Sequence, residues 1–265
     1  MIMQEMLWLL ANHLDYEKAA EIPVTFGTLV HDEFAEEILE RVRGDARKER
    51  KVELLRSSRV PLIDAEESPR VIKTHLPLSL LPPKLLDTCK VVYVARNPKD
   101  VAVSYYHLNR RDNVHAYQGD FPKFWDYFTR GLVVFGPHCD HVAEAWSHRN
   151  HPNMKFLFYE NLITDMKGAI RDLASHIGKK IEPEQIERLS QHLSIDSFRK
   201  NKSINDTSKV IDQLPGLENE NEQAFIRHGK NHGWQEYFTS EMNVAADLWV
   251  QENYDSIPDF AFPKP

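Results

Sequence analysis

This chain of 265 residues is poor in the features that mark disulfide-rich, membrane-spanning or low-complexity proteins. It has only 2 cysteines, 10 glycines and 15 prolines. Two cysteines cannot build a disulfide framework and are typical of a reducing compartment. No apolar run reaches the roughly 18 residues that a membrane-spanning helix needs. Apolar residues at 42% and charged residues at 28% indicate an ordinary globular protein.

Basic side chains are outnumbered as well, because 33 Lys and Arg stand against 40 Asp and Glu, for a formal net charge of −7. A general nucleic-acid binder needs a basic surface, so we expect no nucleic-acid partner. The apolar first ten residues lack the basic start of a secretory signal and include Glu5. Their helical spacing predicts a packed helix over Met3–Leu14 instead. We therefore expect a cytoplasmic protein that does not bind membranes.

Several site motifs are missing too. Neither GxxxxGK[ST] nor GxGxxG occurs, and no magnesium-binding carboxylate is evident, which disfavours a P-loop kinase. The histidines at 138, 141, 148 and 151 and Cys139 have helical spacing, but no second cysteine pair and no HExxH pattern accompany them. We therefore predict no metal site and a partly exposed, histidine-rich helix.

The pattern of apolar residues predicts an α/β fold, in which helices flank a parallel β-sheet. Ligands bind such sheets at the carboxyl ends of the strands, so chemistry is expected just after Ile72, Ala95 and Phe158. The expected strands cover residues 70–73, 90–95 and 155–159. The expected helices cover residues 32–43, 98–110, 121–130, 137–149, 165–177, 183–193 and 241–251.

The clearest strand runs directly into Arg96, Asn97 and Pro98. Asn97 is a good N-cap, Pro98 suits the first helical position, and a helix N-terminus after a strand is a natural phosphate site. Arg96 adds a guanidinium, and Ser104 on the same helix adds a hydroxyl. Residues 69–111 hold eight basic and two acidic side chains, which favours a small polyanionic ligand. Alternatively, Arg96 pairs with Asp100 and Ser104 only packs.

Two further segments are candidates for chemistry. Lys73 and His75 alternate past a strand candidate, so in an extended chain both point to one face. A histidine can take a proton from a hydroxyl while a lysine steadies charge on a transferring group. The alternative is a structural histidine beside a surface lysine. Residues 225–234 combine cations with glycines, which fits either a loop over a phosphate or a plain surface loop.

Taken together, residues 70–77, 93–106, 156–160 and 227–229 resemble the cytosolic sulfotransferases, which use 3′-phosphoadenosine 5′-phosphosulfate (PAPS). The resemblance covers nearly the whole chain. It implies a single domain over residues 1–265 with the P-loop-NTPase-like sulfotransferase fold. It also implies sulfuryl transfer from PAPS to a small, largely apolar acceptor with a hydroxyl, such as a phenol, sterol or alcohol, without a metal.

The resemblance implies a role for each matching residue. His75 matches the base that deprotonates the acceptor hydroxyl, and Lys73 matches the lysine that stabilises the sulfuryl group. Arg96 and Ser104 match the pair that binds the 3′-phosphate. Other residues match further cofactor-binding positions, with His228 standing where the family usually has lysine: Tyr159, Ser197, Phe198, Arg227, His228 and Gly229.

Two family features are not recognisable. The family has a phosphosulfate-binding loop of the Lys-Ser/Thr-Gly-Thr-Thr type after its first strand, whereas residues 4–8 resemble the helix that follows this loop. We therefore expect a chain truncated at its N-terminus relative to the family, without that strand and loop. The alternative function is a non-catalytic or truncated relative that binds the nucleotide weakly or not at all. A homodimer stays open, because residues 238–241 do not match the family's Lys-Thr-Val-Glu dimer motif.

Overall fold

The structure, a computed structural model, describes residues 1–21, 40, 43–46, 49, 63–65, 67–111, 117–201 and 233–263. These residues fall into two compact units. Unit 1 lies within Met1–His75, Leu108–Tyr117 and Arg188–Arg227. Unit 2 lies within Leu76–His107, Gln118–Glu187 and His228–Pro265. Most of the helix expected over residues 32–43 lies outside the described residues.

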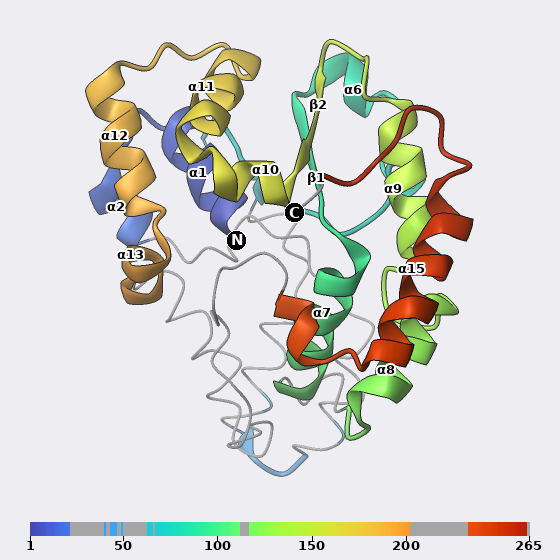
Figure 1. Cartoon of the computed structure of the whole chain (residues 1–265). Coiled ribbons are helices and arrows are strands. Elements are labelled where there is room, and N and C mark those ends of the chain that lie inside the picture. The colour runs from blue at the N-terminus through green and yellow to red at the C-terminus, as the bar shows by residue number, and fades with distance from the viewer. Residues whose placement is uncertain are drawn as a thin grey trace. The chain divides into compact units, whose positions relative to one another are not determined.

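Unit 2 contains a parallel pair of strands, β1 (Val91–Ala95) and β2 (Met154–Phe158), as Figure 1 shows. Val91 pairs with Met154 and Ala95 pairs with Phe158, so both strands end at the same edge. Parallel strands need a crossover connection, and three helices between the strands supply it. These helices are α7 (Pro98–Arg111), α8 (Phe121–Thr129) and α9 (His138–Ser147). The expected α/β arrangement is confirmed.

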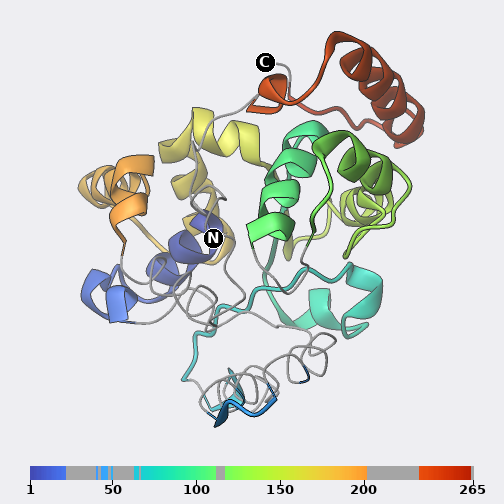
Figure 2. The ribbon, with the colours of Figure 1, turned by 90° about the horizontal axis from the view of Figure 1, so that it is seen from below.

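Aromatic side chains join α7 and α8, whose ribbons lie side by side in Figure 2. The ring centroids of Tyr105 and Phe124 lie 6.1 Å apart, and those of Tyr106 and Phe121 lie 5.5 Å apart. Both pairs have the edge-to-face geometry that aromatic rings favour. The contacts fix α7, the helix that begins where β1 ends.

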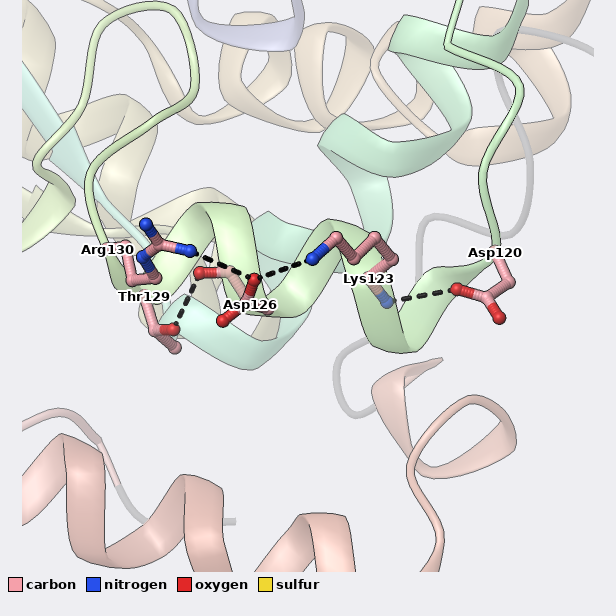
Figure 3. Close-up of polar contacts among 5 residues, drawn as sticks. All are labelled: Asp120, Lys123, Asp126, Thr129 and Arg130. Atoms are coloured by element: carbon pink, nitrogen blue, oxygen red, sulfur yellow. Dashed lines mark hydrogen bonds and ion pairs between the residues drawn. The ribbon is translucent and has the colours of Figure 1, made fainter.

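Local hydrogen bonds and ion pairs stabilise helix α8, as Figure 3 shows. The carboxylate of Asp120 accepts the backbone N–H of Lys123 at 3.0 Å, which makes Asp120 an N-cap. The Asp126 carboxylate lies 3.3 Å from the Lys123 ammonium and 3.4 Å from the Arg130 guanidinium. The Thr129 hydroxyl donates to the Asp126 backbone carbonyl at 3.0 Å.

The core of unit 2 packs β1 and β2 against α9 and α15 (Ser240–Tyr254). Ala95, Val142, Tyr254 and Ile257 are buried at its centre. Large side chains that are partly buried surround them: Tyr93, Trp146, Phe156, Phe158, Trp249, Phe260 and Phe262. This apolar face holds the strands in place and leaves their carboxyl ends for polar residues.

Unit 2 has further elements among its described residues. They are η2 (Leu78–Leu80), α6 (Leu85–Thr88), α10 (Tyr159–Thr164), α11 (Met166–His176) and η3 (Gly233–Glu236). Helix α11 buries Ile170, Leu173 and Ala174, whose spacing follows one helical face. The sequence predicted α11 to within a residue at each end.

Unit 1 contains α1 (Ile2–Ala11), α2 (Tyr16–Glu21) and α13 (Ile195–Lys200), together with the end of α12 (Pro183–His192). Met6 and Leu9 of α1 are fully buried, which confirms the expected N-terminal helix. The buried Glu5 accepts from the His192 Nε2 atom at 2.8 Å and from the Asn201 amide at 3.0 Å. An acid in the apolar run is therefore paired with polar groups that follow much later in the sequence.

The strand expected over residues 70–73 is wrong. Only Lys73 has a β-bridge, and its neighbour Ile72 is 50% exposed. Pro69 and Pro77 flank this segment, and proline cannot donate a hydrogen bond to a ladder. Two adjacent apolar residues, Val71 and Ile72, between prolines were therefore too weak a signal for a strand.

The described part of the chain has no helix that is long and apolar enough to cross a membrane.

Candidate active site

Polar residues gather where β1 and β2 end, and we call Arg96, Asn97, Asp100, Tyr159 and Glu160 the strand-end cluster. Arg96 and Tyr159 directly follow the paired residues at the ends of the two strands. The Arg96 guanidinium carbon lies 4.5 Å from the centroid of the Tyr159 ring, which is a cation–π distance. The two strand ends thus bring together residues that the sequence singled out separately.

Helix α7 starts as the sequence predicted. The Asn97 side-chain carbonyl accepts the backbone N–H of Lys99 at 3.0 Å, and Pro98 is the first helical residue. This cap satisfies one of the N–H groups at the helix start, where the positive end of the helix dipole lies. The N-terminus of α7 beside Arg96 is therefore suited to an anion.

Arg96 also makes the ion pair that the alternative interpretation anticipated. Its guanidinium lies 3.6 Å from the Asp100 carboxylate, whose side chain is 2% exposed, while the Arg96 side chain is 23% exposed. A guanidinium carries several N–H donors in a planar fork, so this ion pair is compatible with anion binding. The ion pair with Asp100 therefore orients the Arg96 guanidinium. Ser104 is exposed one further turn along α7, on the face that Asp100 shares.

Lys99 of the basic segment is buried and contacts η3 and α15. Its ammonium contacts the Asp247 carboxylate, donates to the Asn243 side-chain carbonyl at 2.7 Å and lies 4.2 Å from the Trp234 ring centroid. The Trp234 backbone N–H donates to Asp100 at 3.3 Å. Lys99 and Asp100 therefore fasten η3 and α15 to the first turn of α7.

Burial and neighbouring charges shift the pKa of the Tyr159 phenol in both directions. Burial raises the pKa of Tyr159, the Arg96 guanidinium opposes that rise, and the carboxylates of Asp100 and Glu160 add to it. The phenol is therefore a neutral group at physiological pH, able to donate one hydrogen bond or accept one.

Other residues that the sequence singled out lie in unit 1. His75 is exposed, and burial lowers the pKa of the Lys73 ammonium. The roles expected for His75 and Lys73 stay predictions. Ser197 and Phe198 lie on α13, where the Ser197 backbone N–H donates to the Ser194 hydroxyl and Phe198 is buried at 5% exposure.

Arg227, His228 and Gly229 lie outside the described residues. The roles expected for these three residues stay predictions.

Two histidines of α9 are engaged in hydrogen bonds to tyrosines. His138 Nδ1 lies 2.5 Å from the Tyr254 hydroxyl, and His141 Nδ1 lies 2.8 Å from the Tyr93 hydroxyl. Within the part of the chain that the structure describes, no group of three His, Cys, Asp or Glu side chains could hold a metal ion. Both cysteines are free thiols.

Comparison with known proteins decides the family. Residues 1–258 match the family model described as the sulfotransferase domain. The chain belongs to the sulfotransferase family. It is 32% identical over 259 residues to the luciferin sulfotransferase of Photinus pyralis, an alignment that covers 94% of this chain and 67% of that protein. It is 35% identical over 187 residues to the mouse sulfotransferase 1B1, with 70% and 61% covered.

A solved structure is similar to this chain in both sequence and fold. The chain is 36% identical to retinol dehydratase in complex with androsterone and the inactive cofactor PAP, with a TM-score of 0.86. The match covers 99% of this chain and 79% of that one. By contrast, the chain spans only 61–67% of the length of the firefly and mouse sulfotransferases.

Sequence reasoning missed contacts in and beside the strand-end cluster. Glu160 was recognised only as part of a motif, and Lys99 only as one of several cations. Their partners, the Asn97 N–H and the Asp247 carboxylate, lie 63 and 148 positions away in the sequence, so no local pattern could have revealed them. The Arg96–Asp100 pair, four residues apart, was anticipated as an alternative.

Proposed function

We propose that this sulfotransferase moves a sulfuryl group from PAPS to the hydroxyl of a small, largely apolar acceptor. The observation that carries the proposal is the strand-end cluster, in which Arg96 lies over the Tyr159 ring at the start of α7. A guanidinium, a helix N-terminus and an aromatic ring are what a phosphorylated adenosine needs for recognition. The relative bound to PAP supports the same nucleotide.

In this proposal, Arg96 and Ser104 bind the 3′-phosphate, and Tyr159 lies against the adenine. Ser197, Phe198, Arg227, His228 and Gly229 complete the nucleotide site as the family resemblance implies. No metal takes part, because cations and backbone N–H groups suffice to hold the phosphates. Phe198 is buried, which favours packing of its side chain over direct contact with the nucleotide.

His75 acts as the general base of the proposed reaction. Its imidazole takes the proton of the acceptor hydroxyl as that oxygen attacks sulfur. A bond forms between sulfur and the acceptor oxygen, and the bond between sulfur and the 5′-phosphate oxygen breaks, which releases adenosine 3′,5′-bisphosphate (PAP). The Lys73 ammonium offsets the negative charge on the sulfuryl oxygens. His75 then gives its proton to solvent.

The acceptor class follows from the relatives' names. Luciferin, retinol and androsterone appear in the names of the relatives and their complexes. All three have a hydroxyl, and retinol and androsterone are largely apolar. We propose an acceptor of this kind, a cytoplasmic location and no nucleic-acid or membrane partner. Because the strand-end cluster lies within one chain, the proposal does not require a homodimer.

The direct test measures nucleotide binding and transfer separately. Calorimetric titration with PAP should show binding, and labelled sulfate should pass from PAPS to retinol, androsterone or a phenol. Dehydrated product is followed as well, since one relative is a retinol dehydratase. Binding without transfer to any acceptor would favour the alternative, a non-catalytic relative. Absence of both would overturn the proposal.

A separate variant tests the proposed role of His75 as the general base. His75→Ala should lower the transfer rate by about 10³-fold, within the range that general-base catalysis contributes, and leave PAP affinity unchanged. The matched control is His148→Ala, which removes an exposed histidine from the end of α9. Turnover retained in His75→Ala would refute the role of His75.

A further inference from the structure

Glu160 is a buried acid that joins the end of one strand to the turn that follows the other. It is 5% exposed and is the second residue of α10, directly after β2 and Tyr159. Its Oε1 atom accepts the backbone N–H of Asn97 at 2.8 Å. Asn97 lies in the turn between β1 and α7, so this hydrogen bond spans 63 positions of sequence.

The bond fixes the turn that carries Arg96. The Asn97 side chain caps α7 through the Lys99 N–H, while the Asn97 backbone N–H is held by Glu160. Arg96 lies between this restrained residue and the last residue of β1, and its guanidinium rests on the neighbour of Glu160, Tyr159. Without an acceptor the Asn97 N–H would lose its partner, and the turn would shift to recover one.

Geometry and charge make opposite predictions for this acid. As a negative charge beside an anion site, Glu160 would weaken anion binding. As a hydrogen-bond acceptor, it would strengthen anion binding by holding the turn, and a neutral amide oxygen would serve equally well. The second carboxylate oxygen, Oε2, is buried and makes no hydrogen bond among the described residues, so only Oε1 is engaged there.

We propose that Glu160 is a positioning residue for the 3′-phosphate site, acting through the Asn97 backbone N–H on the orientation of Arg96. This role rests on the proposed function, because it presumes that the strand-end cluster binds the 3′-phosphate of adenosine 3′,5′-bisphosphate. Glu160 itself need not touch the nucleotide.

The test isolates the contribution of the 3′-phosphate to binding. Calorimetry gives the Kd of adenosine 5′-monophosphate and the Kd of PAP, and their ratio is the gain from the 3′-phosphate. Glu160→Ala should lower this ratio by about tenfold, which is what a lost buried acceptor can cost. Glu160→Gln keeps an acceptor oxygen and should retain the ratio to within about twofold or raise it.

The matched control is Asp120→Ala, which removes the carboxylate that accepts a backbone N–H at the start of α8. It should lower stability and leave the ratio unchanged. Should Glu160→Ala fail to fold, Glu160→Asp replaces it, because the shorter side chain withdraws the acceptor by one methylene and should lower the ratio as well.

Two results would overturn the proposal. A wild-type ratio near one would show that the protein gains nothing from the 3′-phosphate, so that no 3′-phosphate site exists. The proposed function would then fail as well. A high wild-type ratio that survives in Glu160→Ala, or in Glu160→Asp where that is the folded variant, would overturn the positioning role alone. An equal loss in Glu160→Gln would show that the charge, and not the acceptor, is what matters, which also contradicts this role.

Discussion

The strand-end cluster and helix α9 are both rich in polar side chains, yet unit 2 uses them in opposite ways. In the strand-end cluster, Arg96 forms an ion pair with Asp100, and Glu160 accepts the Asn97 backbone N–H across the two strand ends. On α9, by contrast, burial lowers the pKa of His138 to about 4, an effect to which His141 adds, and burial raises the pKa of Tyr254. The His138–Tyr254 pair is therefore neutral inside the fold.

The difference distinguishes the proposed binding site from a structural polar pair. Arg96 keeps 23% of its side chain exposed beside a helix N-terminus, so a ligand can reach its charge. His138 and Tyr254 satisfy each other within a core of aromatic rings. His138 and His141, which look like metal ligands in the sequence, are hydrogen-bonded to tyrosines, whereas Arg96 is the residue that we propose binds an anion.

Of the changes that test this comparison, a fall in pH should have the largest effect, which is a loss of stability. His138 has a folded pKa of about 4, below its ordinary value of 6.5. Its contribution to stability is therefore complete above pH 6.5 and is lost as the pH falls toward 4, by up to about 3 kcal/mol. His138→Gln keeps a hydrogen-bonding group and should remove this part of the decline. Urea unfolding between pH 4 and pH 7.5 measures it.

His148→Gln is the control for this experiment, because His148 is exposed at the end of α9. It should keep the wild-type decline in stability. If His138→Gln also kept the full decline, the neutral pair would not be the origin of the acid sensitivity.

A smaller effect, on binding and not on stability, is expected at the strand ends. Arg96→Ala should weaken PAP binding by about 30-fold, since a hydrogen bond to a charged group contributes about 2 kcal/mol. Arg96→Lys keeps the charge without the planar fork, so its PAP affinity should lie between those of the wild type and Arg96→Ala. Calorimetric titration measures each Kd.

The control for Arg96 is Arg130→Ala, which removes an exposed arginine from the end of α8. Its PAP affinity should equal that of the wild type. An Arg96→Ala protein with wild-type affinity would place the anion site elsewhere and remove the contrast between the two regions.

The smallest effect, again on stability, is expected at a helix cap that lies outside both the strand-end cluster and α9. Asp120→Ala removes the N-cap of α8 drawn in Figure 3 and should lower stability by about 1 kcal/mol, seen as a fall of about 3 °C in Tm. Asp126→Ala removes only exposed ion pairs and should cost less than about 0.5 kcal/mol. An equal fall in both variants would contradict the capping role.

How far the sequence could predict the fold depended on how local each signal was. The continuous apolar run before Arg96 and the Asn97–Pro98 pair predicted β1 and the start of α7 correctly. Residues 70–73 do not form the expected strand, and within them only Lys73 has a β-bridge. The candidate site divided in the same way. The sequence placed Arg96 and Tyr159 at strand ends and anticipated Asp100 as a partner of Arg96, but the contact between Glu160 and the Asn97 N–H could not be predicted.

The sequence by itself determined the helix caps, the apolar runs, the local excess of positive charge and the motifs that mark a sulfotransferase. Only the tertiary structure decided that Lys99 pairs with Asp247 and that Glu160 holds the Asn97 N–H. The physical reason is range. Caps and periodicity act within a few residues, whereas these partners are 63 and 148 positions apart and meet only when parallel strands and their helices pack.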